Sequence, residues 1–209
     1  AATLIHTSNL YYTKPMIELA KILVENSFAD RCIFLNSGAE AIEAAIKLAR
    51  RWGKDTKDGA FEVISAQDGF HGRTMGSLAA TGTVRYREPF EPMVPGFSHV
   101  PWNDIEAIKA ATTPMTAAVL LEPIQGEGGV NMPAPGYLQG VRDWCTANNV
   151  LLIFDEIQTG NGRTGKLFAY ETEGVVPDIM ALAKGMAGGV PIGAVEVPEH
   201  VFIRRWFLK

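Results

Sequence analysis

The stretch LLIFDEIQTG, residues 151–160, decides the fold class, because an apolar run ends there in two carboxylates, Asp155 and Glu156. A strand that is apolar at successive positions is typical of a parallel sheet with both faces covered. TAAVLLE at 116–122 and PDIMALAKG at 177–185 have the same character. We therefore expect a buried strand at 150–156 whose end is polar.

Segments of helical period separate these strands along the chain. Helices are expected at 15–26, 39–53, 103–111 and 135–149, and strands at 31–36, 61–66, 116–122, 150–156, 177–185 and 191–197. We interpret Gly53 as the stop of the second helix. Alternating helices and strands predict an α/β fold, a mostly parallel sheet with helices on both faces. The segment 81–97 is rich in Pro and Gly and is predicted to be a long functional loop.

Composition narrows the classes of partner. The chain has 209 residues, 47% of them hydrophobic, and a formal net charge of −4 at pH 7. This balance predicts a globular protein and favours neither nucleic acid nor a membrane as partner. No apolar run reaches the ~18 residues of a membrane span. Cys32 and Cys145 lie far apart in apolar patterns, which indicates buried thiols in a reducing compartment, so we expect a cytoplasmic protein.

Polar and glycine-rich residues gather directly after the predicted strands. In an open parallel sheet, the carboxyl ends of the strands form the crevice in which ligands bind. The residues found there are NSGAEA, FHGRT, EPIQGEGG, DEIQTG and Lys184. Core packing does not require such residues, so we expect the binding site at this edge of the sheet.

The segment SGAEA, residues 37–41, has two interpretations. Ser37 and Glu40 have the spacing of a capping box, which needs no ligand. Alternatively, Gly38 lets backbone N–H groups approach a phosphate at the helix N-terminus, where the helix dipole favours an anion by ~0.3–1 kcal/mol. In that case the Glu40 side chain has to turn aside. The segment lacks the spacing and the lysine of a Walker loop.

Lys184, between an apolar strand and the glycine-rich segment GMAGG, also has two interpretations. A lysine at the end of an element commonly extends its amine to water. Alternatively, burial lowers the pKa of the amine, and the neutral form can then make a Schiff base with an aldehyde. The glycines that follow would leave room for a bulky adduct.

Asp155 needs a cationic partner, because a carboxylate at the end of a buried strand is otherwise costly. A protonated heterocyclic nitrogen would serve, with a Coulomb energy of about 4 kcal/mol at 4 Å and an effective dielectric of 20. A protein Arg or Lys is the alternative partner.

Metal and serine-nucleophile chemistry find little support in the motifs. His71, His99 and the carboxylates do not show an HExxH or similar spacing of ligands, and we expect no metal site. A G-x-S-x-G elbow is absent as well.

Taken together, the motifs resemble the pyridoxal-phosphate-dependent aminotransferases of class III, and most closely those of the acetylornithine type. The motifs are HTSNLYY, LNSGAEAIEAAIKLAR, FHGRT, EPIQGEGGV, DEIQTGNGRTGKLFAYE and PDIMALAKGMAGGVPIGA. The resemblance covers residues 4 to about 195. It implies the large domain of the type I fold of these enzymes.

The resemblance implies that pyridoxal 5'-phosphate is the cofactor. Lys184 would bind it covalently and move the proton of the substrate Cα, and Asp155 would keep the pyridine nitrogen protonated. The other residues that the resemblance assigns to the cofactor are Ser37, Gly38, Ala39, Phe70 and Gln158.

The resemblance also implies a substrate side. Arg73 would bind the substrate α-carboxylate, for which a planar guanidinium is suited. Glu122 and Glu127 would lie on the same side, with Glu127 paired to an arginine of a C-terminal domain. The implied reaction transfers an amino group from N-acetylornithine, or an ornithine-like donor, to 2-oxoglutarate in arginine biosynthesis, in a homodimer.

Several alternatives stay open at this point. Other class III enzymes, such as 4-aminobutyrate aminotransferases, aminomutases and decarboxylases, share the cofactor motifs. A non-catalytic cofactor-binding domain is a further alternative, because members of the family are about twice as long and a small C-terminal domain is expected to be missing. We divide the chain into an N-terminal segment 1–14, a large cofactor domain 15–197 and an atypical tail 198–209.

Overall fold

The computed structural model describes residues 4, 6–7 and 11–202, in which seven strands form one sheet in the order β1-β7-β6-β5-β4-β2-β3. The strands are β1 (Arg31–Leu35), β2 (Glu62–Ala66), β3 (Phe97–Val100), β4 (Thr116–Leu121), β5 (Leu151–Asp155), β6 (Ile179–Leu182) and β7 (Gly193–Val197). Neighbouring strands are parallel, except that β7 is antiparallel to both β1 and β6. The predicted α/β class with a mostly parallel sheet is confirmed.

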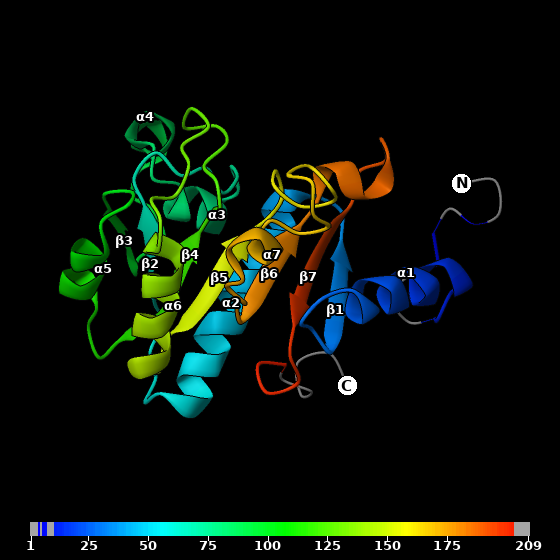
Figure 1. Ribbon diagram of the computed structural model, residues 1–209, viewed down its shortest axis with the longest axis horizontal. Helices are drawn as coiled ribbons and strands as arrows, with labels where there is room; N and C mark the ends of the chain where they lie inside the picture. The colour runs from blue at the N-terminus through cyan, green and yellow to red at the C-terminus, as the bar shows by residue number, and fades with distance from the viewer. Residues whose placement is uncertain (1–3, 5, 8–10, 203–209) are drawn as a thin grey trace.

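Helices cover both faces of this sheet (Figure 1). They are α1 (Lys14–Glu25), α2 (Gly38–Thr56), α3 (Met75–Ala80), α4 (Val84–Arg87), α5 (Ile105–Ala111), α6 (Tyr137–Ala147), α7 (Tyr170–Glu173) and the short 3-10 helices η1 (Glu88–Phe90) and η2 (Lys184–Ala187). One face packs on α2, and the other on α5 and α6. In Figure 1, α1 lies beside β1 at one edge of the sheet and α5 beside β3 at the other.

Apart from Thr116 at the start of β4 and Asp155 at the end of β5, the central strands are apolar, because both of their faces are covered. In β4, Leu120 packs in the layer of α2 and Leu121 in the layer of α6, and neither is exposed. In β5, Ile153 packs in the layer of α2 and Phe154 in the layer of α6. Asp155 is the next residue on the α2 side, so its carboxylate emerges at the carboxyl end of the sheet.

Helix α2 does not stop at Gly53, as the sequence suggested, but continues to Thr56. A Cβ atom at position 53 would collide with the carbonyl oxygen of Ala60. The glycine therefore serves the close approach of the following segment to the helix and is not a helix stop.

The segment 81–97 is more regular than the predicted long loop. It contains α4 and η1 and leads into β3, which pairs with β2 in parallel at the edge of the sheet. Ser98 and His99 interrupt the apolar pattern of β3, and an edge strand does not require that pattern.

The ends of the chain are described only in part. Three of the seven residues of the motif HTSNLYY, residues 8–10, and most of the expected tail 198–209 lie outside the described residues. Among the helices that are described, none is long and apolar enough to cross a membrane.

Candidate active site

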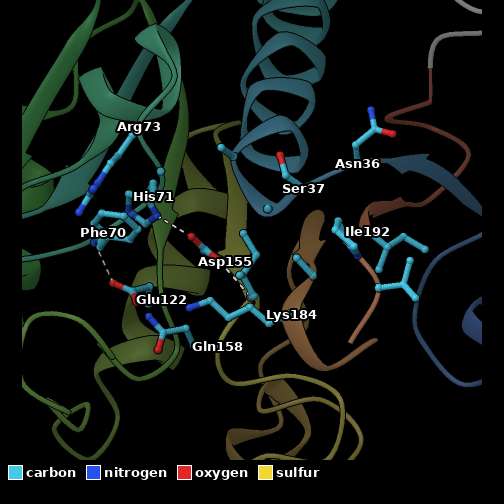
Figure 2. Close-up of a pocket in the computed structure, with 17 residues that line it drawn as sticks. Asn36, Ser37, Phe70, His71, Arg73, Glu122, Asp155, Gln158, Lys184 and Ile192 are labelled. Carbon is cyan, nitrogen blue, oxygen red and sulfur yellow. Dashed lines mark hydrogen bonds and ion pairs between the residues drawn. The ribbon is translucent and has the colours of Figure 1, made fainter. Parts of the chain in front are cut away.

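The carboxyl ends of the parallel strands open into a cavity of about 390 Å³ (Figure 2). Its wall is formed by Asn36, Ser37, Gly38, Ala39, Phe70, His71, Gly72, Arg73, Glu122, Asp155, Ile157, Gln158, Ala183, Lys184, Val190, Pro191 and Ile192. All of the residues that the sequence assigned to the site line this cavity except Glu127. The carboxyl ends of the strands therefore bring these residues together around one cavity.

The N-terminus of α2 forms one side of the cavity, and its hydrogen bonds contain one half of the capping box that the sequence suggested. The Ser37 hydroxyl accepts a hydrogen bond from the Glu40 amide at 3.2 Å. The Glu40 carboxylate turns back and accepts from the Asn36 amide at 2.7 Å. The amides of Gly38 and Ala39 lie in the first helical turn, where the helix itself offers no acceptor. They remain in the cavity wall, and the helix dipole favours an anion there.

Gly38 lets this helix end pack closely on the strand ends. A Cβ atom at position 38 would lie 2.9 Å from Ile157 Cδ1 and 3.3 Å from the Ala183 Cβ. A larger residue would push α2 away from the loops that follow β5 and β6. The glycine thus keeps the helix N-terminus against the part of the wall that carries Asp155 and Lys184.

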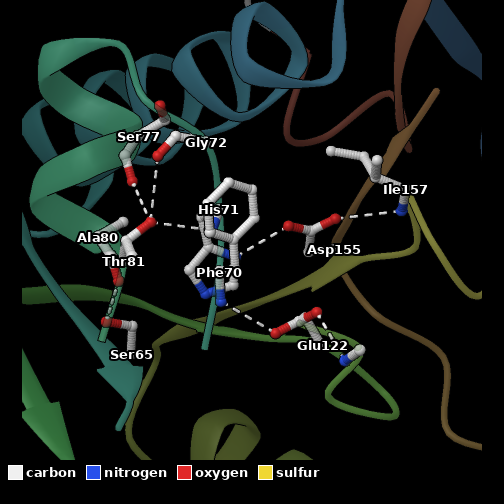
Figure 3. Close-up of polar contacts among 11 residues, drawn as sticks. Ser65, Phe70, His71, Gly72, Ser77, Ala80, Thr81, Glu122, Asp155 and Ile157 are labelled. Carbon is white, nitrogen blue, oxygen red and sulfur yellow. Dashed lines mark hydrogen bonds and ion pairs between the residues drawn. The ribbon is translucent and has the colours of Figure 1, made fainter. Parts of the chain in front are cut away.

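Asp155 is buried, and its carboxylate is held from two sides (Figure 3). Its Oδ2 lies 2.8 Å from His71 Nδ1, and its Oδ1 accepts from the Ile157 amide at 3.1 Å. Within the described residues no Arg or Lys pairs with Asp155. The alternative partner for Asp155, a protein Arg or Lys, is therefore not found in the described part of the chain.

His71 belongs to the site, although the sequence reasoning considered it only as a metal ligand. Its amide donates to the Thr81 hydroxyl at 2.9 Å, which ties the loop after β2 to the end of α3. Its Nε2 is buried and has no hydrogen-bond partner among the described residues. The signal that could have identified it is its position in FHGRT, after a strand, beside the predicted Phe70 and Arg73.

Glu122, at the end of β4, is buried in the same wall. Its Oε2 accepts from the Phe70 amide at 3.1 Å and its Oε1 from the Gly126 amide at 3.2 Å. Burial raises the pKa of Glu122 to about 7, opposed by nearby His71 and reinforced by nearby Asp155. The side chain thus holds the backbone that presents Phe70, beside any role toward substrate.

Lys184 opens η2 with a backbone φ of 46°, in the left-handed region that residues other than glycine rarely adopt. Such strain is found at functional sites. The side chain points into the cavity and is exposed, yet partial desolvation still lowers the pKa of its amine. Asp155, Glu122 and Glu127 act in the opposite direction.

Arg73 and Gln158 occupy the remaining wall (Figure 2). The Arg73 guanidinium carbon lies 5.9 Å from the centre of the Phe70 ring and 5.3 Å from that of the Tyr86 ring. A Cβ atom at position 126 would come within 2.7 Å of the Gln158 side chain, so the glycine-rich segment after β4 leaves room for it.

Glu127 does not line the cavity but lies near it. Its carboxylate accepts a hydrogen bond from the Tyr86 hydroxyl at 3.2 Å. Tyr86 comes from α4, within the segment 81–97, and the sequence reasoning did not single it out. It links the predicted Glu127 to the predicted Arg73.

The other histidine weighed as a metal ligand is occupied elsewhere. His99 Nε2 lies 3.1 Å from the Ala79 carbonyl oxygen, and burial lowers the pKa of the ring to about 4. The described residues hold no group of three or more His, Cys, Asp or Glu side chains arranged to bind a metal ion.

A family model described as aminotransferase class-III matches residues 1–205, and the chain belongs to that family. The acetylornithine aminotransferase of Methanocaldococcus jannaschii is 55% identical over 203 residues, which are 96% of this chain and 51% of that protein. That of Caldanaerobacter subterraneus is 53% identical over 200 residues, 95% of this chain and 51% of that protein. The chain spans about half the length of these curated relatives.

Solved structures agree with this assignment. The ornithine aminotransferase of Toxoplasma gondii superposes with a TM-score of 0.89 at 40% identity, covering 97% of this chain and 49% of that chain. A second structure of that enzyme, with a TM-score of 0.88 and 40% identity, covers 93% of this chain and 47% of its own and is described with partial occupancy of pyridoxal phosphate at its active site.

Proposed function

We propose that this chain is the large cofactor domain of a pyridoxal-phosphate-dependent aminotransferase of the acetylornithine type. Such an enzyme transfers an amino group from N-acetylornithine, or an ornithine-like donor, to 2-oxoglutarate in arginine biosynthesis. The observation that carries the proposal is one cavity that joins a strained lysine, a buried acid and a helix N-terminus. The curated relatives named above, which are acetylornithine aminotransferases, support this choice of donor.

The residues of the cavity fit pyridoxal phosphate. The amides of Gly38 and Ala39 at the start of α2 suit a phosphate, and the Ser37 hydroxyl lies beside them. Asp155, which meets only neutral backbone and a histidine, suits a protonated ring nitrogen. Phe70 and Gln158 would contact the ring, and Lys184 would supply the amine that binds the aldehyde.

When bound, pyridoxal phosphate supplies an aldehyde that captures amines and a ring that withdraws electrons from the substrate Cα. Asp155, oriented by His71, would keep the ring nitrogen protonated. Lys184 Nζ, once free, would take the proton from Cα, and its lowered pKa favours the neutral form that this step needs.

Arg73 would orient the substrate through its α-carboxylate. Its guanidinium packs on two aromatic rings and makes neither an ion pair nor a hydrogen bond with the described residues. Its donors are therefore open to a carboxylate. Glu122 and Glu127 would shape the same side of the pocket.

The proposal also covers the domain bounds, the oligomeric state and the cellular compartment of the enzyme. We propose that residues 15–197 form the cofactor domain, that the enzyme is a homodimer and that it works in the cytoplasm.

A panel of amino donors tests the proposed reaction. N-acetylornithine, ornithine and 4-aminobutyrate are each incubated with the protein, pyridoxal phosphate and 2-oxoglutarate, and glutamate formation is measured. The proposal predicts the fastest formation with N-acetylornithine. Glutamate from 4-aminobutyrate alone would indicate a different class III aminotransferase, and a chain that binds the cofactor without turnover would indicate a non-catalytic domain.

A further inference from the structure

Tyr86, in the short helix α4, contacts several residues on the substrate side of the site. Its ring lies near two guanidinium groups, with Arg73 Cζ at 5.3 Å and Arg85 Cζ at 5.0 Å from the ring centre. It meets the Phe70 ring edge to face, at 5.8 Å and 80°. Its hydroxyl donates to Glu127 at 3.2 Å and accepts from Arg85 at 3.3 Å.

Arg73 is held by aromatic rings, which leave its hydrogen-bond donors unused. Aromatic faces attract a guanidinium without using its N–H donors, which lie in the plane at the edge of the group. Arg73 has no hydrogen-bond acceptor among the described residues. Contacts with Phe70 and Tyr86 can therefore fix the position of the guanidinium while every donor stays free for a ligand.

The hydroxyl of Tyr86 binds the carboxylate of Glu127. A free carboxylate near a free guanidinium tends to pair with it, which would occupy the donors that a substrate carboxylate needs. Tyr86 instead gives the Glu127 carboxylate a hydrogen bond of its own. The same bond, together with that from Arg85, holds the hydroxyl end of the phenol ring in place.

We propose that Tyr86 is a positioning residue for substrate recognition, whose ring presents the open donors of Arg73 to a carboxylate while its hydroxyl binds Glu127. This inference rests on the proposed function, in which Arg73 binds the carboxylate of an amino or keto acid. Tyr86 itself touches neither substrate nor cofactor in this scheme.

Glutarate is the probe for the test, because it carries the carboxylates of 2-oxoglutarate but has no keto group and cannot react. Its affinity for the full 209-residue chain, incubated with pyridoxamine phosphate, is measured by calorimetry. Tyr86→Leu, which removes both ring and hydroxyl, is expected to weaken binding about tenfold. Tyr86→Phe keeps the ring and is expected to stay within about threefold of the unmodified chain.

A second readout follows the arginine directly. In the NMR spectrum of the unmodified chain, the Arg73 Nε–H signal is expected to be shifted by the Tyr86 ring current and to show contacts to the Tyr86 ring protons. Tyr86→Phe retains the shift, and Tyr86→Leu loses most of it. Phe90→Leu, at an aromatic residue of η1 that is exposed, is the matched control and leaves both readouts unchanged.

The outcomes distinguish a failure of the positioning role of Tyr86 from a failure of the proposed function. If Arg73→Leu abolishes glutarate binding but Tyr86→Leu changes neither readout, the positioning role is wrong and the function stands. Equal losses in Tyr86→Phe and Tyr86→Leu would also overturn it, because the ring would then be irrelevant. If the unmodified chain does not bind glutarate, or if Arg73→Leu leaves the binding unchanged, both the proposed function and this inference are wrong. Should Tyr86→Leu fail to fold, missing ring contacts to Arg73 in the unmodified chain would still refute the proposal.

Discussion

His71 Nδ1 lies 2.8 Å from Asp155 Oδ2, and both side chains are buried at the inner wall of the cavity. The backbone amide of Ile157 holds the other carboxylate oxygen. The orientation of this acid therefore does not depend on a ligand. A cofactor ring that enters the cavity meets a carboxylate already in place.

Replacing His71 tests this relationship. His71→Ala leaves a buried carboxylate oxygen of Asp155 without its partner, and we expect a loss of about 1–3 kcal/mol in the free energy of unfolding. Urea unfolding of the cofactor-free chain measures it. His200→Ala, at an exposed histidine, is the control and is expected to change the value by less than about 0.5 kcal/mol. Equal effects of the two variants would show that the His71–Asp155 contact contributes nothing to stability.

Gly38 is expected to control cofactor affinity through packing. In Gly38→Ala the new methyl group meets Ile157 Cδ1 at 2.9 Å, so the first turn of α2 has to move. We expect pyridoxal phosphate to bind about tenfold more weakly in a spectral titration.

The matched rescue for Gly38→Ala is the added change Ile157→Val, which removes the Cδ1 atom. The double variant is expected to regain part of the lost affinity. A glycine substitution without effect, or one that the second change makes worse, would contradict the packing argument.

Glu196 is predicted to make stability depend on pH. It is buried on β7 opposite Cys32 and Met180, and neither of its oxygens makes a hydrogen bond of good geometry with the described residues. Burial raises its pKa from 4.5 to about 7, and the nearby Ser27 hydroxyl offsets only part of that rise. The folded chain then holds a proton that the unfolded chain has lost, so stability falls as pH rises from 4.5 to about 7.

Glu196→Gln removes this titration while keeping the shape of the side chain. Compared with the unmodified chain, the variant is expected to lose less stability over this pH range, by an amount on the order of 3 kcal/mol. Urea unfolding at several pH values measures the difference. Glu18→Gln, on the exposed surface of α1, serves as the control. Identical pH profiles for Glu196→Gln and the unmodified chain would refute the prediction.

The sheet was predictable because its central strands carry a strong signal. β4 and β5 are buried on both faces, and their sequences are apolar except for Thr116 at the start of β4 and Asp155 at the end of β5. β3 escaped prediction because Ser98 and His99 break that pattern, and the strand has a neighbour on one side only. The end of α2 was misplaced because Gly53 stops no helix; it makes room for the Ala60 carbonyl.

The site was predictable as far as it follows the strand ends. Asp155 and Lys184 come directly after apolar runs, and the parallel topology brings such residues together. His71 was missed because a buried histidine beside an acid has no sequence spacing that reveals the contact. Tyr86 was missed because its ring reaches Arg73 and Glu127 only through the fold of the segment 81–97.

The central claim is that Lys184 binds pyridoxal phosphate covalently, and borohydride trapping tests it most directly. The chain is incubated with the cofactor, reduced, weighed intact by mass spectrometry and digested to locate the modified peptide. We predict one added cofactor on the peptide that contains Lys184, its loss in Lys184→Ala, and its retention in the exposed control Lys54→Ala. A chain that gains no mass, or that carries the cofactor on a different lysine, would contradict the account.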